Sequence, residues 1–246
     1  MKPYSLLLAG GLLLTGITQA QTSFSVGPQI GGTYATVRPA SGSWPADPVS
    51  RRGIEAGLTA SLQRGHFAFQ PAVLYTQRGY NRHFVSFDSG FPSSDTYVRF
   101  DYVNVPLRVA YTQHTTGRGF QVSAGPYVGL LVGGKTTTDY QSGYPRGQQV
   151  TGRVVAAETH TVDISSSSLS TPDTNLYARH LDLGAQVGVG YRLGGALLQL
   201  SYSLGLRNVS PTEYYTVGGT KYEDTTPDYR NRSCQASLSY LFGPKN

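Results

Sequence analysis

Cysteine, methionine and tryptophan are almost missing from this chain of 246 residues, which has one of each. Since Cys234 has no second cysteine to pair with, no internal disulfide is available, and burial and hydrogen bonding must stabilise the fold. Long apolar runs are also scarce. Beyond the stretch from Leu6 to Leu14, nothing approaches the roughly 18 consecutive apolar residues of a membrane-spanning helix, which excludes a helical membrane protein.

The chain also lacks a basic stripe and a metal-ligand pattern. Its formal net charge of +6 is scattered along the sequence, which argues against a nucleic-acid partner. His66 and His114 fall in different turns, without the ligand spacing of a metal site. The acidic residues Glu223, Asp224 and Asp228 fit a solvated loop better than a calcium site. We therefore expect no nucleic acid, no metal and no cofactor.

The first 20 residues have the layout of a secretory signal peptide, with Lys2, an apolar run and small residues ending at Ala20. The apolar run is too short to cross a bilayer as a helix. We expect cleavage after Ala20 and a single domain over residues 21–246.

What the sequence does contain is glycine and tyrosine, 30 and 18 residues, and a regular alternation of apolar with polar residues. In Ala196–Arg207, ALLQLSYSLGLR, every second residue is leucine or tyrosine, the period of two that is typical of a β-strand. The same pattern predicts eight strands: Phe24–Tyr34, Ile54–Leu62, Phe67–Tyr75, Val103–Tyr111, Phe120–Leu130, Arg179–Leu193, Ala196–Arg207 and Cys234–Phe242.

The two faces of these strands indicate which side is buried. A soluble lipocalin-like barrel would expose a face rich in lysine and glutamate, but the polar face here is mostly glycine, serine, glutamine, threonine and alanine. The apolar face carries no charge, as contact with lipid requires. We therefore predict an all-β fold, an eight-stranded antiparallel up-and-down transmembrane β-barrel.

The connections support this prediction, because three short joins alternate with four long ones. Short periplasmic turns and long extracellular loops are typical of outer-membrane barrels. This assignment puts both mature termini in the periplasm and gathers six aromatic residues at the periplasmic ends of the strands: Phe24, Phe67, Tyr111, Phe120, Tyr191 and Phe242. The first strand must pair with the last, since an open sheet edge cannot be satisfied in lipid.

The chain resembles the outer-membrane β-barrel domain family that includes PorT-like proteins of Gram-negative envelopes. The resemblance covers nearly all of the mature chain and rests on FSVGPQIGGTY, FAFQPAVLYTQRGY, DYVNVPLRVAY, FQVSAGPYVGLLVGG, LDLGAQVGVGYRL and CQASLSYLF. It implies an outer-membrane location and delivery by the barrel-assembly machinery. The recognition signal ending at Phe242 departs from the usual form, because GPKN follows it.

Six charged residues are predicted to point into the barrel and to form a lumen network, structural or gating: Glu55, Arg78, Arg108, His180, Asp182 and Arg207. Charges inside a narrow barrel should be paired, so we expect a salt-bridged plug. The alternative is a thin water-filled channel lined by the same residues.

The long loops hold a second candidate set of residues. Tyrosine and arginine are enriched at binding hot spots, and the loops contain Tyr140, Tyr144, Arg146, Arg153, Tyr214, Tyr215, Tyr222 and Tyr229. The alternative is that the tyrosines stiffen hairpins while the arginines contact lipopolysaccharide phosphates.

These features favour a non-enzymatic scaffold or surface-interaction protein, in which an accessory role in secretion would follow from the PorT-like resemblance. The second hypothesis is a narrow passive pore for small solutes. The third is a lipid A-modifying enzyme, for which His83, His160, His180 and Ser165–Ser168 supply residue types but no spacing. The expected partners are outer-membrane lipid, lipopolysaccharide, the barrel-assembly machinery and an envelope protein that the sequence does not identify.

A Gly-Pro pair recurs in the first and fifth predicted strands, as Gly27-Pro28 and Gly125-Pro126. A proline inside a sheet removes a ladder hydrogen bond, so we expect a local bulge or bend at each pair. Pro71 and Pro106 should mark further breaks in the ladder.

Overall fold

The computed structural model describes residues 22–39, 48–85, 93–142, 145–146, 149–150, 153–164, 167–169, 176–210, 212–217, 220–224 and 229–243. The predicted signal peptide lies outside these ranges. Eight long strands form the body of the molecule: β1 (Ser23–Pro39), β2 (Val49–Arg64), β3 (Phe67–Phe84), β4 (Ser93–Thr112), β5 (Gly119–Ser142), β11 (Leu181–Leu193), β12 (Ala196–Gly205) and β15 (Tyr229–Tyr240).

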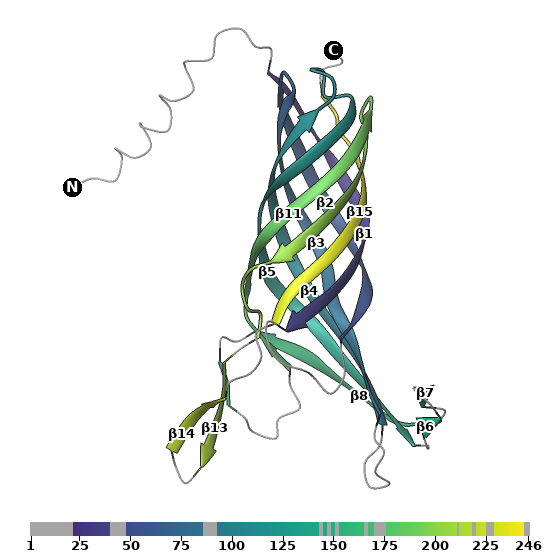
Figure 1. Ribbon diagram of the computed structural model, residues 1–246, viewed down its shortest axis with the longest axis vertical. Helices are drawn as coiled ribbons and strands as arrows, with labels where there is room; N and C mark the ends of the chain where they lie inside the picture. Colours follow the sequence, from purple (N-terminus) through teal and green to yellow (C-terminus); the bar gives the residue numbers. More distant parts are fainter. Residues whose placement is uncertain are drawn as a thin grey trace, which may run out of the picture.

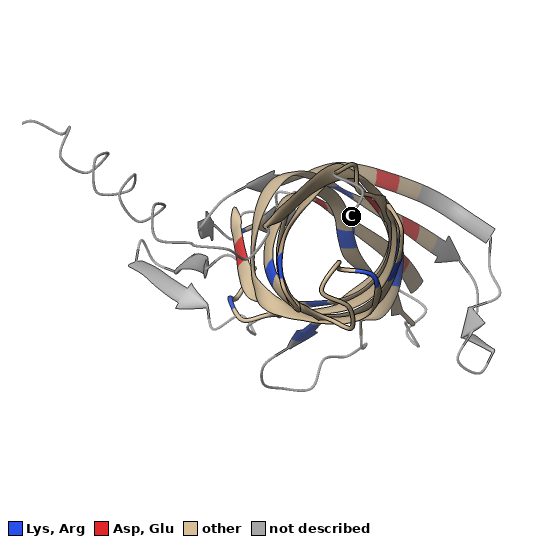
Figure 2. Cartoon of the chain, turned by 90° about the horizontal axis from the view of Figure 1, so that it is seen from above, with Lys and Arg blue, Asp and Glu red and all other residues tan. Residues whose placement is uncertain are grey.

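The eight strands close into a ring, in which each strand pairs with its neighbours in the chain and the last pairs with the first (Figures 1 and 2). The closing ladder runs from Gln29 opposite Ser239 to Pro39 opposite Tyr229. All eight pairings are antiparallel. The predicted eight-stranded up-and-down barrel and its closure are therefore confirmed.

Within the described ranges, no helix has the length and hydropathy needed to span a membrane.

Three tight turns join strands at one end of the barrel, which we call the turn end; the opposite end is the loop end. The turns lie at Gly65–His66, at residues 113–118 and at Gly194–Gly195. Gly65 and Gly194 each have a φ of +58°, a conformation that glycine adopts without strain. The described chain also begins and finishes at the turn end (Figure 1).

The faces of the barrel are as the alternation predicts. Every barrel strand exposes large apolar side chains on its outward face, such as Ile30, Leu58, Val109 and Leu198. Inward residues are mostly small or polar, with many glutamines, serines and threonines, and almost all are buried. At the turn end the six predicted aromatic residues are all exposed, and Phe120 packs edge-on against Tyr191 with ring centroids 4.9 Å apart.

The prolines of the two Gly-Pro pairs interrupt the ladder without shifting its register, so the expected bulge is absent at both, and a bend there stays a prediction. Between β1 and β15 the pairing skips Gly27 and Pro28 and resumes at Val26 in the same register. The ladder between β4 and β5 skips Gly125 and Pro126 in the same way. The glycines permit close approach of the strands, since a Cβ on Gly27 would overlap the carbonyl oxygen of Tyr240.

The other proline expectation is confirmed, because ladder gaps adjoin Pro71 and Pro106. True register shifts occur elsewhere, between Ser50 and Glu55 of β2 and between Asp101 and Tyr102 of β4.

Strands β3, β4 and β5 continue past the barrel at the loop end and form a projecting sheet with β8 (Arg153–Ile164) (Figure 1). These strands are longer than predicted because the sequence stops alternating there while the hydrogen-bonded ladder continues. Shorter strands complete the loop end: β6 (Pro145–Arg146), β7 (Gln149–Val150), β9 (Ser167–Leu169), β10 (Leu176–Ala178), β13 (Thr212–Val217) and β14 (Thr220–Asp224).

Candidate functional site: the barrel lumen

Arg78 and Asp182 form an ion pair across the lumen. Arg78 comes from β3 and Asp182 from β11, which are three strands apart in the ring. The Arg78 Nη1 atom lies 2.8 Å from the Asp182 Oδ2 atom, and both side chains are fully buried. Removing two charges from water costs several kcal/mol, so their attraction and further hydrogen bonds must offset that cost.

Two tyrosines and one asparagine surround the pair. The guanidinium carbon of Arg78 lies 4.8 Å from the ring centroid of Tyr127 and 5.6 Å from that of Tyr102, within cation–π range. The Tyr127 hydroxyl and the Asn231 amide both donate to Asp182 Oδ2, at 3.2 and 3.0 Å. Asn231 also donates to the Tyr102 hydroxyl at 3.3 Å. The five residues, from five different strands, make one buried layer that we call the charged layer.

Glu55 and Arg108 are both buried in the lumen. These two described residues do not form an ion pair with each other. Glu55 accepts a hydrogen bond of 2.8 Å from the Gln29 amide. Arg108 donates one of 3.1 Å across the lumen to Gln199, whose own amide donates to Ser123. Four of the six predicted network residues therefore lie inside the barrel, but only Arg78 and Asp182 are joined directly.

The remaining space is filled by amide and hydroxyl side chains that bond to one another. Gln70 and Gln121 exchange hydrogen bonds near the turn end. Gln186 donates to Ser203 and Gln235, which are themselves hydrogen-bonded. An eight-stranded barrel leaves an interior just wide enough for such side chains to fill.

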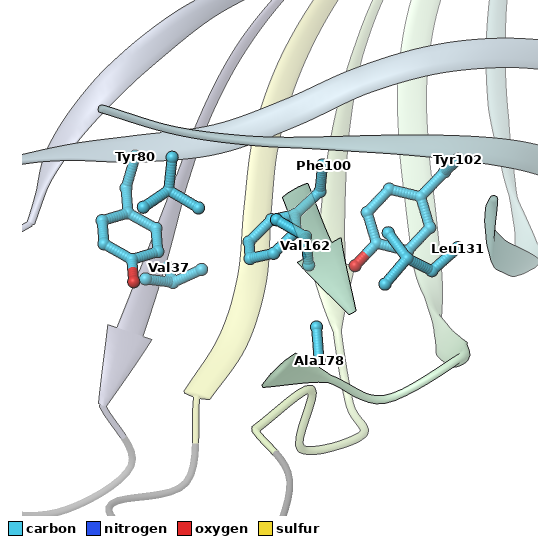
Figure 3. Packing of buried hydrophobic residues seen from close by; sticks show 8 residues of the cluster. Val37, Tyr80, Phe100, Tyr102, Leu131, Val162 and Ala178 are labelled. Carbon is cyan, nitrogen blue, oxygen red and sulfur yellow. The ribbon is translucent and has the colours of Figure 1, made fainter. Parts of the chain in front are cut away.

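The charged layer adjoins a cluster of buried apolar residues, which we call the apolar cap (Figure 3). Its members are buried residues of β1, β3, β4, β5, β8 and β10: Val37, Tyr80, Val98, Phe100, Tyr102, Leu131, Val162 and Ala178. The strands β8 and β10, which pair in parallel, supply Val162 and Ala178 from outside the ring. Tyr102 belongs to both the cap and the charged layer.

His180 and Arg207 do not join the network, and their predicted places in it are corrected. Both side chains are exposed. The reason is that β11 begins at Leu181 and β12 ends at Gly205, so neither residue is held in the alternating geometry that turns a side chain inward.

The structure scatters the predicted loop residues over several elements. Tyr140 is half-buried in β5, and Tyr229 packs against the apolar cap. Tyr215 lies opposite Tyr222 in the hairpin of β13 and β14, next to Tyr214. Tyr144 is outside the described residues, and the side chains of Arg146, Arg153, Tyr214, Tyr215 and Tyr222 are likewise not described.

The candidate enzyme residues also lie apart. His83 contacts Asp95 at 2.6 Å on the projecting sheet, and His160 contacts Glu158 at 3.7 Å on β8. His180 is on the loop that precedes β11. Of the predicted serines, Ser165 and Ser166 are outside the described residues, and Ser167 and Ser168 lie in β9. Among the described residues, no group of three or more His, Cys, Asp or Glu side chains could hold a metal.

Sequence reasoning missed Tyr102, Tyr127 and Asn231. Tyr127 stands at an inward position of the predicted fifth strand, where a large side chain among glycines and serines was the available signal. Tyr102 and Asn231 lie just beyond the predicted ends of their strands. Continuing the alternation by a few residues would have turned both inward.

Comparisons with known proteins agree with this architecture. The profile of a family described as "Outer membrane protein beta-barrel domain" matches residues 19–210. Among curated proteins no relative matches the chain.

Several solved structures are similar at low identity. Neisserial surface protein A is 14% identical, covering 89% of this chain and 97% of that one, with a TM-score of 0.37. The attachment invasion locus protein Ail of Yersinia pestis is 10% identical, covering 89% and 98%, with a TM-score of 0.38.

Proposed function

Because this chain belongs to the outer membrane protein beta-barrel domain family, we propose that it is a non-enzymatic surface-interaction protein whose closed barrel anchors a binding sheet outside the cell. The observation that carries the proposal is the continuation of β3, β4 and β5 beyond the barrel, where β8 joins them. A barrel that only spanned the membrane would not need ladders of this length.

The proposed orientation puts the turn end in the periplasm and the projecting sheet outside. Short turns and long loops support it, since this asymmetry is the rule for outer-membrane barrels. Both mature termini are then periplasmic, after removal of residues 1–20. Labelling a Thr137→Cys, Cys234→Ser variant on intact cells with a membrane-impermeant maleimide tests the orientation, and protection of the introduced thiol until lysis would contradict it.

Within the described residues, the outer strand of the projecting sheet, β8, has strand pairing along most of its length on one side only. β8 pairs with β5 from Arg153 to Thr161 on one side, while on its other side the described residues add only β10, opposite Val162–Ile164. Unpaired edge groups are a template for an added strand from another protein. We therefore propose a partner that docks in an extended conformation along β8.

The same sheet also carries negative charge. Asp95 and Asp139 lie directly opposite each other in the ladder of β4 and β5. Burial first, and then these two carboxylates, raise the pKa of the Tyr97 hydroxyl. Like charges placed opposite each other destabilise a sheet, but Arg99 and Lys135 are also opposite each other and His83 contacts Asp95, so the sheet offers charged contacts of both signs to a partner.

Shortening the hairpin of β5 and β8 tests this function. Thr138 lies opposite Glu158, so replacing residues 139–157 by a Gly-rich turn removes the sheet's tip and keeps the lower ladder in register. We expect the barrel to assemble and crosslinking to an extracellular or envelope partner to be lost. A control variant with a Gly-Ser insertion between Thr115 and Thr116 at the turn end should keep the crosslink.

Unchanged crosslinking by the shortened protein would contradict the role of the projection. Crosslinking that depends on the turn end instead would favour a periplasmic partner and the accessory role in secretion. The proposal that the protein is not an enzyme would fail if purified membranes showed lipid A deacylation or acyl transfer that is lost on substitution of His83, His160 or His180.

A further inference from the structure

Four arginines lie on the outward face of the barrel wall at its loop end. They belong to parts of β1, β2 and β15 that lie beyond the predicted strand ends. We call them the basic rim: Arg38, Arg52, Arg230 and Arg232. Each arginine lies an even number of residues from an exposed outward residue of its own strand, such as Tyr34 in β1 or Cys234 in β15. Arg52 is directly opposite Tyr34. The rim therefore points toward the membrane side of the wall and away from the lumen.

Within the described part of the chain, the rim has no acidic partner. Arg38 and Arg230 lie directly opposite each other in the ladder of β1 and β15. Like charges in this arrangement repel and destabilise the sheet. No Asp or Glu stands on the outward face of β12, β15, β1 or β2, and the ion pairs among the described residues include no rim arginine. A negative charge from outside the chain would remove the repulsion.

An apolar groove of about 770 Å³ adjoins the rim on the same outer face. Arg52 and Tyr34 line it where it meets the rim, and Tyr202, Leu200 and Val187 are among its other walls. Gly32, an outward residue without a side chain, also lines the groove. Its volume falls within the roughly 300–1,000 Å³ of ligand sites.

We propose that the basic rim and this groove bind one phosphorylated glycolipid of the lipid A class, with its phosphates on the arginines and an acyl chain in the groove. Guanidinium groups bind phosphate through two parallel hydrogen bonds, which explains why the rim is arginine throughout. Tyr34 and Tyr202 line the groove in the same ladder row as Arg52, and exposed aromatic residues of this kind mark a membrane interface.

Charge complementarity selects this occupant over others. A neutral lipid would fill the groove and leave the Arg38 and Arg230 repulsion in place. Free phosphate would satisfy the arginines and leave the apolar walls unused. The inference rests on the proposed orientation, which puts the rim in the outer leaflet. Lipid A binding in detergent does not depend on how the barrel is oriented in the membrane. A failure of the lipid A proposal can therefore be told apart from a failure of the proposed orientation.

The experiment measures binding of bis-phosphorylated lipid A to the purified mature protein in detergent by native mass spectrometry. Arg38→Gln, Arg230→Gln should weaken binding by about tenfold or more, because charge-assisted bonds to phosphate are lost. The control Arg64→Gln, Arg118→Gln lowers the net charge equally at the turn end and should bind like the unmodified protein. Heat-dependent gel mobility verifies that each variant is folded.

Filling the groove tests the acyl-chain part. Gly32→Leu meets no backbone obstacle, since the nearest atom to an added Cβ, the Gly53 carbonyl oxygen, is 4.0 Å away. It should weaken lipid A binding, whereas Ala56→Leu, outward but outside the groove, should not. Equal binding by the rim variant and its control overturns the proposal. Equal binding of dephosphorylated lipid A, or displacement of lipid A by inorganic phosphate alone, also overturns it.

Discussion

Arg78 is the residue on which the lumen depends most. It is fully buried, and a single carboxylate, Asp182, balances its charge. The faces of Tyr102 and Tyr127 add a second source of negative potential, and Asn231 holds Asp182 in place. Such a pair is a weak source of net stability, but losing one partner leaves an uncompensated buried charge.

Substitution of either charged partner should therefore destabilise the barrel more than substitution of both. We expect Arg78→Met and Asp182→Leu each to lower the free energy of unfolding by about 3–5 kcal/mol. The double variant should be less destabilised than either single one, since the unpaired charge is gone. Urea unfolding in detergent, followed by gel mobility, measures all three. Additive effects in the double variant would contradict a coupled pair.

At the scale of elements, the seam between β1 and β15 decides whether the sheet closes. The ladder between them is interrupted beside Pro28, where the strands approach so closely that an inward Cβ on Gly27 would overlap the Tyr240 carbonyl oxygen. The Gly-Pro pair thus permits close packing at the turn end of the seam. The pair Gly125-Pro126 permits the same close packing between β4 and β5, since a Cβ on Gly125 would overlap the Leu107 carbonyl oxygen.

Gly27→Ala should impair closure, because the seam must move apart to accept one methyl group. Overpacking of this kind costs about 1–3 kcal/mol. Gly32→Ala in the same strand has open space and serves as the matched control. We expect a lower temperature for loss of the compact gel band in Gly27→Ala alone. Equal behaviour of the two variants would show that the seam tolerates a wider spacing.

At the scale of the whole molecule, the charged layer, the hydrogen-bonded glutamines and the apolar cap are made of buried side chains, which favours a plug over a passive channel. Under the proposed function the barrel is an anchor, and the two surfaces left for function are the projecting sheet and the outer wall. The acidic residues are distributed unevenly along the molecule. Every Asp and Glu of the described residues lies in the loop-end half of the barrel, in the projecting sheet or in the shorter loop-end strands, and the turns have only basic charges.

Refolded protein in planar bilayers should show no conductance steps of porin size, because ions would have to displace buried side chains at each level. Heat-dependent gel mobility of the same sample controls for folding. Porin-sized steps from a verified folded sample would overturn the plug and favour the narrow pore.

The sequence by itself determined the strand number, the inward and outward faces, the position of the turns and the aromatic residues at the turn end. Each of these follows from local alternation and from the solubility of a side chain in lipid or in a narrow lumen. The loop-end limits of several strands were predicted too short, since a ladder can continue after alternation weakens, as in β4 and β5, whereas β11 and β12 were predicted two residues too long. For the same reason the basic rim fell outside every predicted strand.

Only the tertiary structure decided which inward charges meet. Arg78 and Asp182 are 104 residues apart, and neither residue's neighbours in sequence indicate the other. Their contact depends on the register of every strand between them and on closure of the ring. The same applies to the apolar cap, in which Val162 and Ala178 come from β8 and β10, outside the ring of eight strands. Alternation specifies a face, whereas a partner across the barrel is set by the geometry of the whole ring.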